Sequence, residues 1–155
     1  MRTVLMVVMA LAVSVSAAPQ SPAARNAAEA PHITVHRVKT CGCCGKWIEH
    51  LKAAGFTVTD NIRETREGAP GRDRVPEQLR SCHTAAAGGY IIEGHVPADV
   101  IRDLLQKRPD VEGLAVAGMP AGSPGMESPN PVPYEVIAFD KAGRTSVFAR
   151  VPAQR

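Results

Sequence analysis

The sequence predicts a single α/β domain, and three observations support that prediction. Apolar and polar side chains alternate over residues 32–38, as they do in a half-buried strand, and a cysteine-rich turn that opens a helix comes directly afterwards. Two short strands separated by two glycines follow later in the chain, and a second helix follows them. These are the parts of a thioredoxin-like sheet with flanking helices, and right-handed crossover connections make this the economical arrangement.

The first half of the domain alternates strands and helices. After the strand over 32–38, apolar residues recur at helical spacing over 47–54 and form one stripe, which Gly55 ends. A second strand follows over 56–62. Residues 63–74 carry mixed charges together with Gly and Pro, so we expect a solvated loop there.

The second half contains shorter elements and ends in a hairpin. Proline begins both of its expected helices, which suits the fixed φ angle of this residue at a first helical position. In order, we expect a single helical turn over 75–79, a hairpin of strands 84–87 and 90–93, a helix between Pro97 and Pro109, a Gly/Pro-rich loop over 111–133, and a terminal hairpin of strands 134–139 and 145–151.

The N-terminus has the pattern of a secretion signal. Arg2 precedes an apolar run over residues 4–13, and small residues that signal peptidase accepts come next. The run is too short for a membrane-spanning helix, which needs about 20 residues. We therefore expect a signal peptide over 1–17, a flexible Ala/Pro-rich leader over 18–31, a folded domain over 32–155 and a periplasmic location.

Charge and composition exclude several classes of function. The chain has 18 basic and 15 acidic residues, and loss of Arg2 with the signal lowers the net charge from +3 to +2. This bias is too small to predict binding to nucleic acid or to an anionic membrane, and no segment after the signal has the pattern of a membrane span. The sequence also lacks Gly-rich phosphate loops, G-x-S-x-G turns and paired carboxylates at a recognisable spacing.

The cysteines give the strongest functional signal. Cys41, Cys43 and Cys44 lie at the start of the first helix, where unpaired N–H groups and the helix dipole favour a thiolate. Dithiol exchange needs only two sulfurs, whereas a soft metal ion gains a ligand from each additional one. Four cysteines in an exported protein can also form two structural disulfides, and that interpretation is the alternative.

Cys82 and His83 form the second part of the expected site. They directly precede the first strand of the hairpin, a place beside the cysteine turn that carries a cis-proline in thioredoxin-like enzymes. Pro76 comes too early in the chain to fill it. We therefore expect Cys82 to face the cysteine turn, so that four sulfurs converge with the His83 imidazole beside them.

Met119 and Met126 form the third part of the expected site. They are the only methionines outside the signal peptide, and their loop has almost no other apolar residue for them to pack against. Thioethers select Cu(I) over zinc, so both are candidate ligands. A zinc site of three cysteines and one histidine remains open but leaves the methionines unexplained. For the other histidines, structural roles are favoured; these are His32, His36, His50 and His95.

Together these residues resemble a family of exported bacterial metal-binding proteins, known as a domain of unknown function, which includes the CopG-type copper-resistance proteins. The blocks that carry the resemblance are Cys41–Trp47, Val75-Pro76, Ser81–Ala85, Gly89–Pro97, Gly113–Pro120 and Gly122–Glu127. Ala117 departs from the pattern, since we expect proline there, and this departure affects loop stiffness. The resemblance implies a thioredoxin-like fold and a periplasmic location. The copper ligands that it implies are Cys41, Cys43, Cys44 and Cys82.

Three hypotheses about function result. In the first, the four cysteines hold Cu(I), as one ion or as a multinuclear cluster, with His83, Met119 and Met126 as outer or exchangeable ligands. Its partners are copper ions and other periplasmic copper-handling proteins, and redox activity on copper is an extension of it. In the second, the protein is a thiol–disulfide oxidoreductase in which Cys41 attacks and Cys44 resolves. In the third, it is a purely structural two-disulfide domain.

Overall fold

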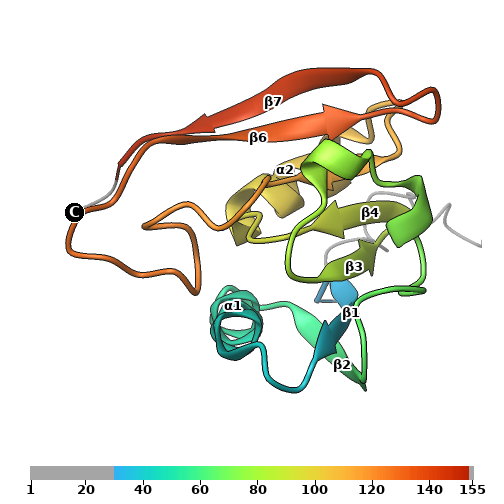
Figure 1. The fold of residues 1–155 in the computed structure, drawn as a ribbon. Helices are drawn as coiled ribbons and strands as arrows, with labels where there is room; N and C mark the ends of the chain where they lie inside the picture. The colour runs from blue at the N-terminus through green and yellow to red at the C-terminus, as the bar shows by residue number, and fades with distance from the viewer. Residues whose placement is uncertain (1–29, 154–155) are drawn as a thin grey trace, which may run out of the picture.

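The computed structural model describes residues 30–153, which form one seven-stranded sheet with two helices (Figure 1). The strands lie in the order β2-β1-β3-β4-β5-β6-β7. The elements are β1 (His32–Val38), α1 (Gly42–Ala53), β2 (Thr57–Arg63), the 3₁₀ turns η2 (Arg72–Arg74) and η3 (Glu77–Leu79), β3 (Thr84–Ala87), β4 (Tyr90–Glu93), α2 (Ala98–Lys107), β5 (Gly113–Ala115), β6 (Tyr134–Phe139) and β7 (Thr145–Val151). The α/β class predicted from the sequence is confirmed.

The strand directions define two crossovers joined by a hairpin. β1 runs parallel to β2, with α1 between them in the chain, and antiparallel to β3. β3 and β4 form the hairpin predicted around the two glycines, with Thr84 opposite Glu93. β4 runs parallel to β5 through α2, and β6 and β7 extend the sheet as an antiparallel hairpin.

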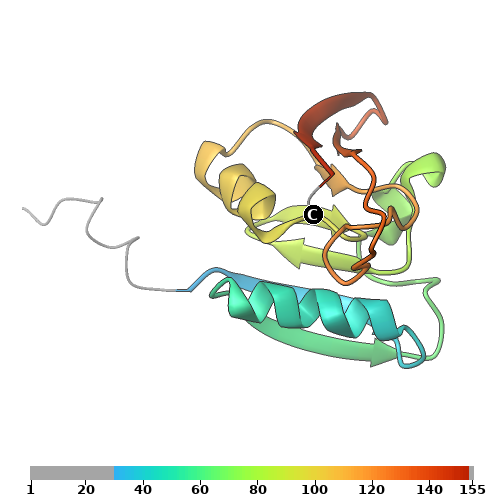
Figure 2. The same cartoon turned by 90° about the vertical axis from the view of Figure 1, so that its left-hand side faces the viewer.

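Both helices contribute to one hydrophobic core. Figure 2 shows α1 lying along β1 and β2, and α2 lies beside the β3-β4 hairpin. The large apolar residues of this cluster that are fully buried are Ile33, Trp47, Leu51, Ile92, Ile101, Leu104 and Leu114. A second, smaller cluster brings the segment with the 3₁₀ turns against the sheet; it contains Val75, Leu79, Ile91, Ala115 and Phe139. The strand register alternates between the two clusters, so both faces of the central strands are covered.

Helix α1 begins inside the cysteine motif. Cys41 is its N-cap and has no side-chain capping hydrogen bond, so Cys43 and Cys44 lie in the first turn. At the other end, Gly55 adopts φ +86°, and the Phe56 N–H donates to the carbonyl of Leu51 at 3.0 Å, the pattern of a Schellman ending. The helix therefore ends at the predicted position, just before Gly55. It begins at Gly42, several residues earlier than the apolar stripe over 47–54 indicated.

Two segments that we expected to be loops are more ordered. Residues 63–74 contain η2, and Arg72 is buried there because its guanidinium pairs with Glu93, a partner that local composition does not reveal. Within 111–133, β5 pairs with β4. A Cβ at Gly113 would collide with the carbonyl oxygen of Ile91, so this strand needs glycine, and a three-residue strand containing glycine shows no alternation.

The expected signal peptide, 1–17, and most of the expected leader, 18–31, lie outside the described residues. Their boundaries stay predictions. Between residues 30 and 153, neither helix is long and apolar enough to cross a membrane.

Candidate metal site

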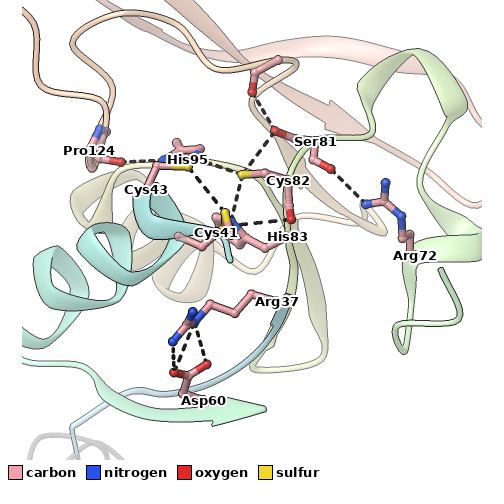
Figure 3. The surroundings of a disulfide bond; sticks show 12 residues. Arg37, Cys41, Cys43, Asp60, Arg72, Ser81, Cys82, His83, His95 and Pro124 are labelled. Carbon is pink, nitrogen blue, oxygen red and sulfur yellow. Dashed lines mark hydrogen bonds and ion pairs between the residues drawn. A yellow bond between two sulfur atoms is a disulfide. The ribbon is translucent and has the colours of Figure 1, made fainter. Parts of the chain in front are cut away.

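The first part of the site is the start of α1 (Figure 3). Cys41 and Cys44 are joined by a disulfide, with Cα atoms 5.3 Å apart, as one helical turn allows. Cys43 is a free, half-buried cysteine whose Sγ lies 3.5 Å from Sγ of Cys41. Three sulfurs are therefore presented together at a helix N-terminus.

Cys82 reaches these sulfurs from the segment that precedes β3. It is a free, buried cysteine, and its carbonyl oxygen lies 3.9 Å from Sγ of Cys44. The four Sγ atoms all lie within 4.8 Å of one another. The structure thus brings together the four sulfurs that the sequence predicted to converge.

Two imidazoles complete a second group around the same sulfur. Nε2 of His95 lies 3.0 Å from Sγ of Cys82, and Nδ1 of His83 lies 3.3 Å from it. A ligand atom from each of these three residues lies within 4.8 Å of the other two. Cys82 is therefore shared between a sulfur-rich group and a Cys-His-His group.

Burial sets the protonation states of the imidazoles. It lowers the pKa of His83 to about 3, and the neighbouring His95 adds to this effect. Burial also lowers the pKa of His95. Because the Pro124 carbonyl can only accept, Nδ1 of His95 carries the proton that it donates there at 2.7 Å, and Nε2 keeps its lone pair facing Cys82. Neutral imidazoles are the form that binds metal ions.

The Cys82 thiol is protonated when no cation is bound. Burial, as the larger cause, and the charge that Cys43 carries when ionised together raise the pKa of this thiol to about 12. A metal ion that binds Sγ must displace this proton, so binding at Cys82 releases a proton to solvent.

His83 is fully buried between the site and the core. Its ring lies 4.3 Å, centroid to centroid, from the ring of Trp47, whose indole N–H donates to the carbonyl of Val96 at 2.8 Å. Nε2 of His83 has no hydrogen-bond partner among the described residues. A buried nitrogen without a partner costs free energy, so this one needs a chemical explanation.

Sequence reasoning assigned a structural role to His95, whereas the structure places it in the site. His95 follows β4 by two residues and Cys82 precedes β3 by two, so the pairing of these two strands brings both residues to the same end of the hairpin. His32 and His50 keep structural contacts. Nε2 of His32 lies 2.9 Å from the Thr59 hydroxyl, and Nε2 of His50 accepts the Ala98 N–H at the start of α2.

The loop that carries the two methionines lies against both parts of the site. A Cβ on Gly125 would come within 2.6 Å of the Cys43 carbonyl oxygen, and the Gly118 carbonyl accepts the Ser81 hydroxyl at 2.6 Å. Met119 is 54% exposed and Met126 is half-buried. The loop therefore packs on the site through its backbone, with Met119 at the surface beside Gly118.

Comparison with known proteins identifies the family. Residues 79–126 match the family described as "Protein of unknown function, DUF411". The solved structure "Copper resistance protein copG- Form 2" is 45% identical with a TM-score of 0.75, and the match covers 80% of this chain and 100% of that chain. "Copper resistance protein copG- Form 1" is 44% identical with a TM-score of 0.73, over 81% and 100%. The chain belongs to the DUF411 family. The copG structures show that this family includes copper-resistance proteins.

The DUF411 match covers much of the site. It begins just before Cys82 and His83, includes His95, and ends at Met126, so it contains every candidate ligand outside the cysteine turn. No curated protein matches the chain. The cysteine cluster and the copper-resistance relatives together fit copper binding.

Proposed function

We propose that this DUF411 protein binds copper for copper resistance or homeostasis, holding Cu(I) through Cys41, Cys43, Cys44 and Cys82. The observation that carries the proposal is the convergence of four Sγ atoms within 4.8 Å. Thiolates are the protein ligands that Cu(I) prefers, and sulfurs this close can bridge more than one ion, which supports a multinuclear cluster. Cys41 and Cys44 bind once their disulfide is reduced to two thiols.

The surrounding donors suit the same ion. Nδ1 of His83 lies 3.3 Å from Sγ of Cys82, and His95 aims a neutral Nε2 at the same atom, so both can complete the coordination of a bound ion. Met119 and Met126 serve as outer or exchangeable ligands from the loop above. Among residues 30–153, the two groups of ligand atoms that come together here consist of cysteine sulfurs and imidazole nitrogens, a donor set that favours copper over hard cations.

The finer features of the proposal extend the family relationship. We propose a thioredoxin-like fold, supported by the β1-α1-β2 crossover and the β3-β4 hairpin with α2. We propose export to the periplasm, supported by the signal pattern over 1–17, and copper exchange with other periplasmic copper-handling proteins. Redox cycling is compatible with thiolate and imidazole ligands. In it, one bound copper ion accepts one electron from an external donor or gives one electron to an external acceptor.

A thiol–disulfide oxidoreductase is the second candidate, and the Cys41–Cys44 disulfide favours it. The bond lies at a helix N-terminus, where an attacking thiolate is stabilised. Cys43 and the buried Cys82 count against it, because their thiols compete with Cys44 in attacking the mixed disulfide that forms with a substrate. A two-disulfide scaffold has no support here, since Cys43 and Cys82 are both free.

One experiment separates the two functions. The reduced protein is loaded with Cu(I) without oxygen, and bound copper and free thiols are measured in wild type, Cys41→Ala and Cys82→Ala. Copper binding requires both cysteines, so each variant should lose retention against a competing Cu(I) chelator. Dithiol exchange through Cys41 and Cys44, in contrast, is lost in Cys41→Ala and does not require Cys82. Two results together would overturn the proposal in favour of the oxidoreductase: a wild type that retains no copper, and a Cys82→Ala variant that still reduces insulin.

A further inference from the structure

The geometry points to Glu93, paired with Arg72, as the positioning residue for Cys82 and His83. This inference rests on the proposed function, since it concerns how the copper-binding thiol and imidazole are held. Nothing in the chemistry of copper requires a carboxylate here, and the pair has no place among the candidate ligands.

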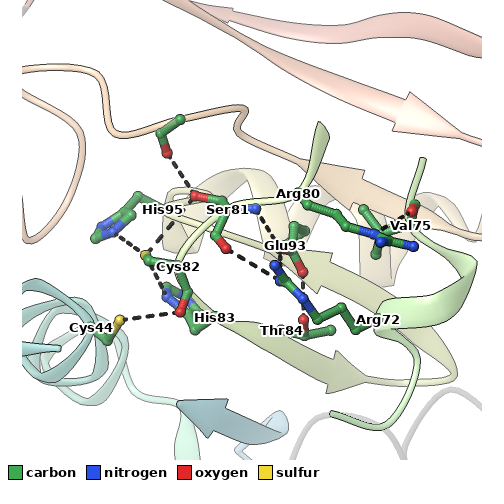
Figure 4. A network of polar contacts seen from close by, with 11 residues as sticks. Cys44, Arg72, Val75, Arg80, Ser81, Cys82, His83, Thr84, Glu93 and His95 are labelled. Carbon is green, nitrogen blue, oxygen red and sulfur yellow. Dashed lines mark hydrogen bonds and ion pairs between the residues drawn. The ribbon is translucent and has the colours of Figure 1, made fainter. Parts of the chain in front are cut away.

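Glu93 holds the chain on both sides of Cys82 and His83 (Figure 4). Its Oε1 accepts the backbone N–H of Ser81 at 2.6 Å, and its Oε2 accepts the hydroxyl of Thr84 at 2.6 Å. One carboxylate at the end of β4 therefore fixes the residue before and the residue after the Cys-His pair.

Arg72 closes the arrangement from the segment that we expected to be solvated. Its Nη1 donates to Oε1 of Glu93 at 2.6 Å and to the carbonyl of Ser81 at 3.2 Å. Both carbonyl and N–H of Ser81 are thus held by the same ion pair. Ser81 also donates its hydroxyl to the carbonyl of Gly118, so the methionine loop is anchored to the residue that the pair holds.

The energetics of burial support a positioning role. The Glu93 side chain is fully buried and that of Arg72 is 9% exposed, so both charges have left water. A buried ion pair contributes little net stability relative to apolar residues of similar size, because desolvation offsets most of the attraction. What the pair supplies here is geometry: with residues 81 and 84 fixed, Sγ of Cys82 stays 3.0 Å from Nε2 of His95.

The same turn provides a matched control. Arg74, two residues after Arg72, pairs with Glu112, whose side chain is 6% exposed. This second pair links η2 to the residue before β5 and makes no hydrogen bond to Ser81 or Thr84. Glu93→Gln and Glu112→Gln therefore make the same chemical change to two buried carboxylates that each pair with an arginine, although Arg74 itself is 57% exposed. Only the first of these pairs holds the Cys82 segment.

The test uses two measurements on the reduced full-length protein. The first, without metal, is the alkylation rate of Cys82 relative to Cys43, read by mass spectrometry. The second is Cu(I) retention against a chelator. Loss of an outer-shell contact typically weakens metal binding about 10- to 100-fold. For Glu93→Gln we expect Cu(I) binding to weaken by that factor and Cys82 to be alkylated faster. For Glu112→Gln we expect both the Cu(I) affinity and the alkylation rate to stay within about twofold of wild type.

Equal effects of the two variants at matched unfolding midpoints, or none in Glu93→Gln, would overturn the positioning role. Thr84→Val, which removes only the bond to Oε2, replaces Glu93→Gln if that variant fails to fold. If the wild type retains no Cu(I), the proposed function fails, whereas the alkylation measurement still decides whether Glu93 holds Cys82.

Discussion

Individual side chains around Cys82 combine properties that suit a soft metal ion. The thiol is buried and protonated, and two neutral imidazoles approach it within 3.3 Å. That the four cysteines and His83 lie close together was predictable, because they occur in two short motifs of the sequence. His95 was not, since a single histidine before a helix has no spacing that distinguishes a ligand from a cap.

Replacement of His95 tests whether this residue is a ligand. His95→Ala removes the nitrogen that lies 3.0 Å from Sγ of Cys82 and should weaken Cu(I) retention by at least about tenfold, as losses around metal sites typically do. His32→Ala is the control, because His32 contacts Thr59 instead of any cysteine. Competition with a Cu(I) chelator gives the affinities, and equal retention by the two variants would leave His95 with a structural role.

His50 makes stability depend on pH. Burial lowers its pKa, although Asp99 and Glu127 act in the opposite direction, and its Nε2 must be unprotonated to accept the Ala98 N–H. The unfolded chain takes up a proton near pH 6.5, where the folded protein resists it. This contribution is therefore fully present above pH 6.5, and it is lost as the pH falls from there through the lower pKa of the folded state.

Denaturant unfolding of wild type and His50→Gln at pH 7.5 and pH 5 measures this contribution. The difference in unfolding free energy between the two proteins should shrink at the lower pH, because only the wild type loses the favourable neutral form. The other buried histidines are present in both proteins and cancel. A difference that is the same at both pH values would contradict the assignment.

At the scale of elements, the site depends on segments that meet only in the folded chain. Helices α1 and α2, the β3-β4 hairpin and strands β6 and β7 were predictable, because local sequence patterns mark each of them. Arg72 and β5 were not, because the ion pair with Glu93 joins residues far apart in the chain, and a three-residue strand has too few side chains to show a pattern. The position of the methionine loop was not predictable either, since it is fixed by contacts of the loop backbone with α1 and Ser81.

The loop contact at Gly125 can be tested by adding one methyl group. Gly125 has φ +85°, and a Cβ there would lie 2.6 Å from the Cys43 carbonyl oxygen and 2.8 Å from the Trp47 backbone nitrogen. Gly125→Ala should therefore lift the loop from α1. Gly118→Ala is the control, because Gly118 also has a positive φ of +68° but nothing near the added atom.

We expect Gly118→Ala to cost about 1 kcal/mol of unfolding free energy from backbone strain alone. Gly125→Ala should cost about 1 to 3 kcal/mol more, since overpacking adds to the strain. Urea unfolding gives both values. Equal costs would show that the loop does not press on the helix in solution.

For the whole molecule, the site joins parts of the sheet that folding must bring together. The cysteine turn follows β1, Cys82 precedes β3 and His95 follows β4, so a bound ion would link three neighbouring strands. The α/β class was predictable from the order of elements, whereas the single seven-stranded sheet was not, because nothing local shows that the terminal hairpin pairs with β5.

Copper should therefore stabilise the whole domain. A ligand that binds only the folded state adds about 2.7 kcal/mol at a free concentration 100 times its Kd. Thermal unfolding of the reduced protein with and without Cu(I) should show a higher Tm when copper is present. Cys82→Ala should remove most of this shift, and a Tm that does not respond to copper in the wild type would contradict the proposed site.

The contact between the Trp47 and His83 rings places an intrinsic fluorophore beside the site. Trp47 is the only tryptophan of the chain, it is fully buried, and its ring lies 4.3 Å from that of His83. Its fluorescence should be blue-shifted and resistant to quenching by iodide in solution, because water does not reach the indole. An ion bound at Cys82 would sit close enough to quench that emission, so copper uptake and release can be followed optically without any attached dye.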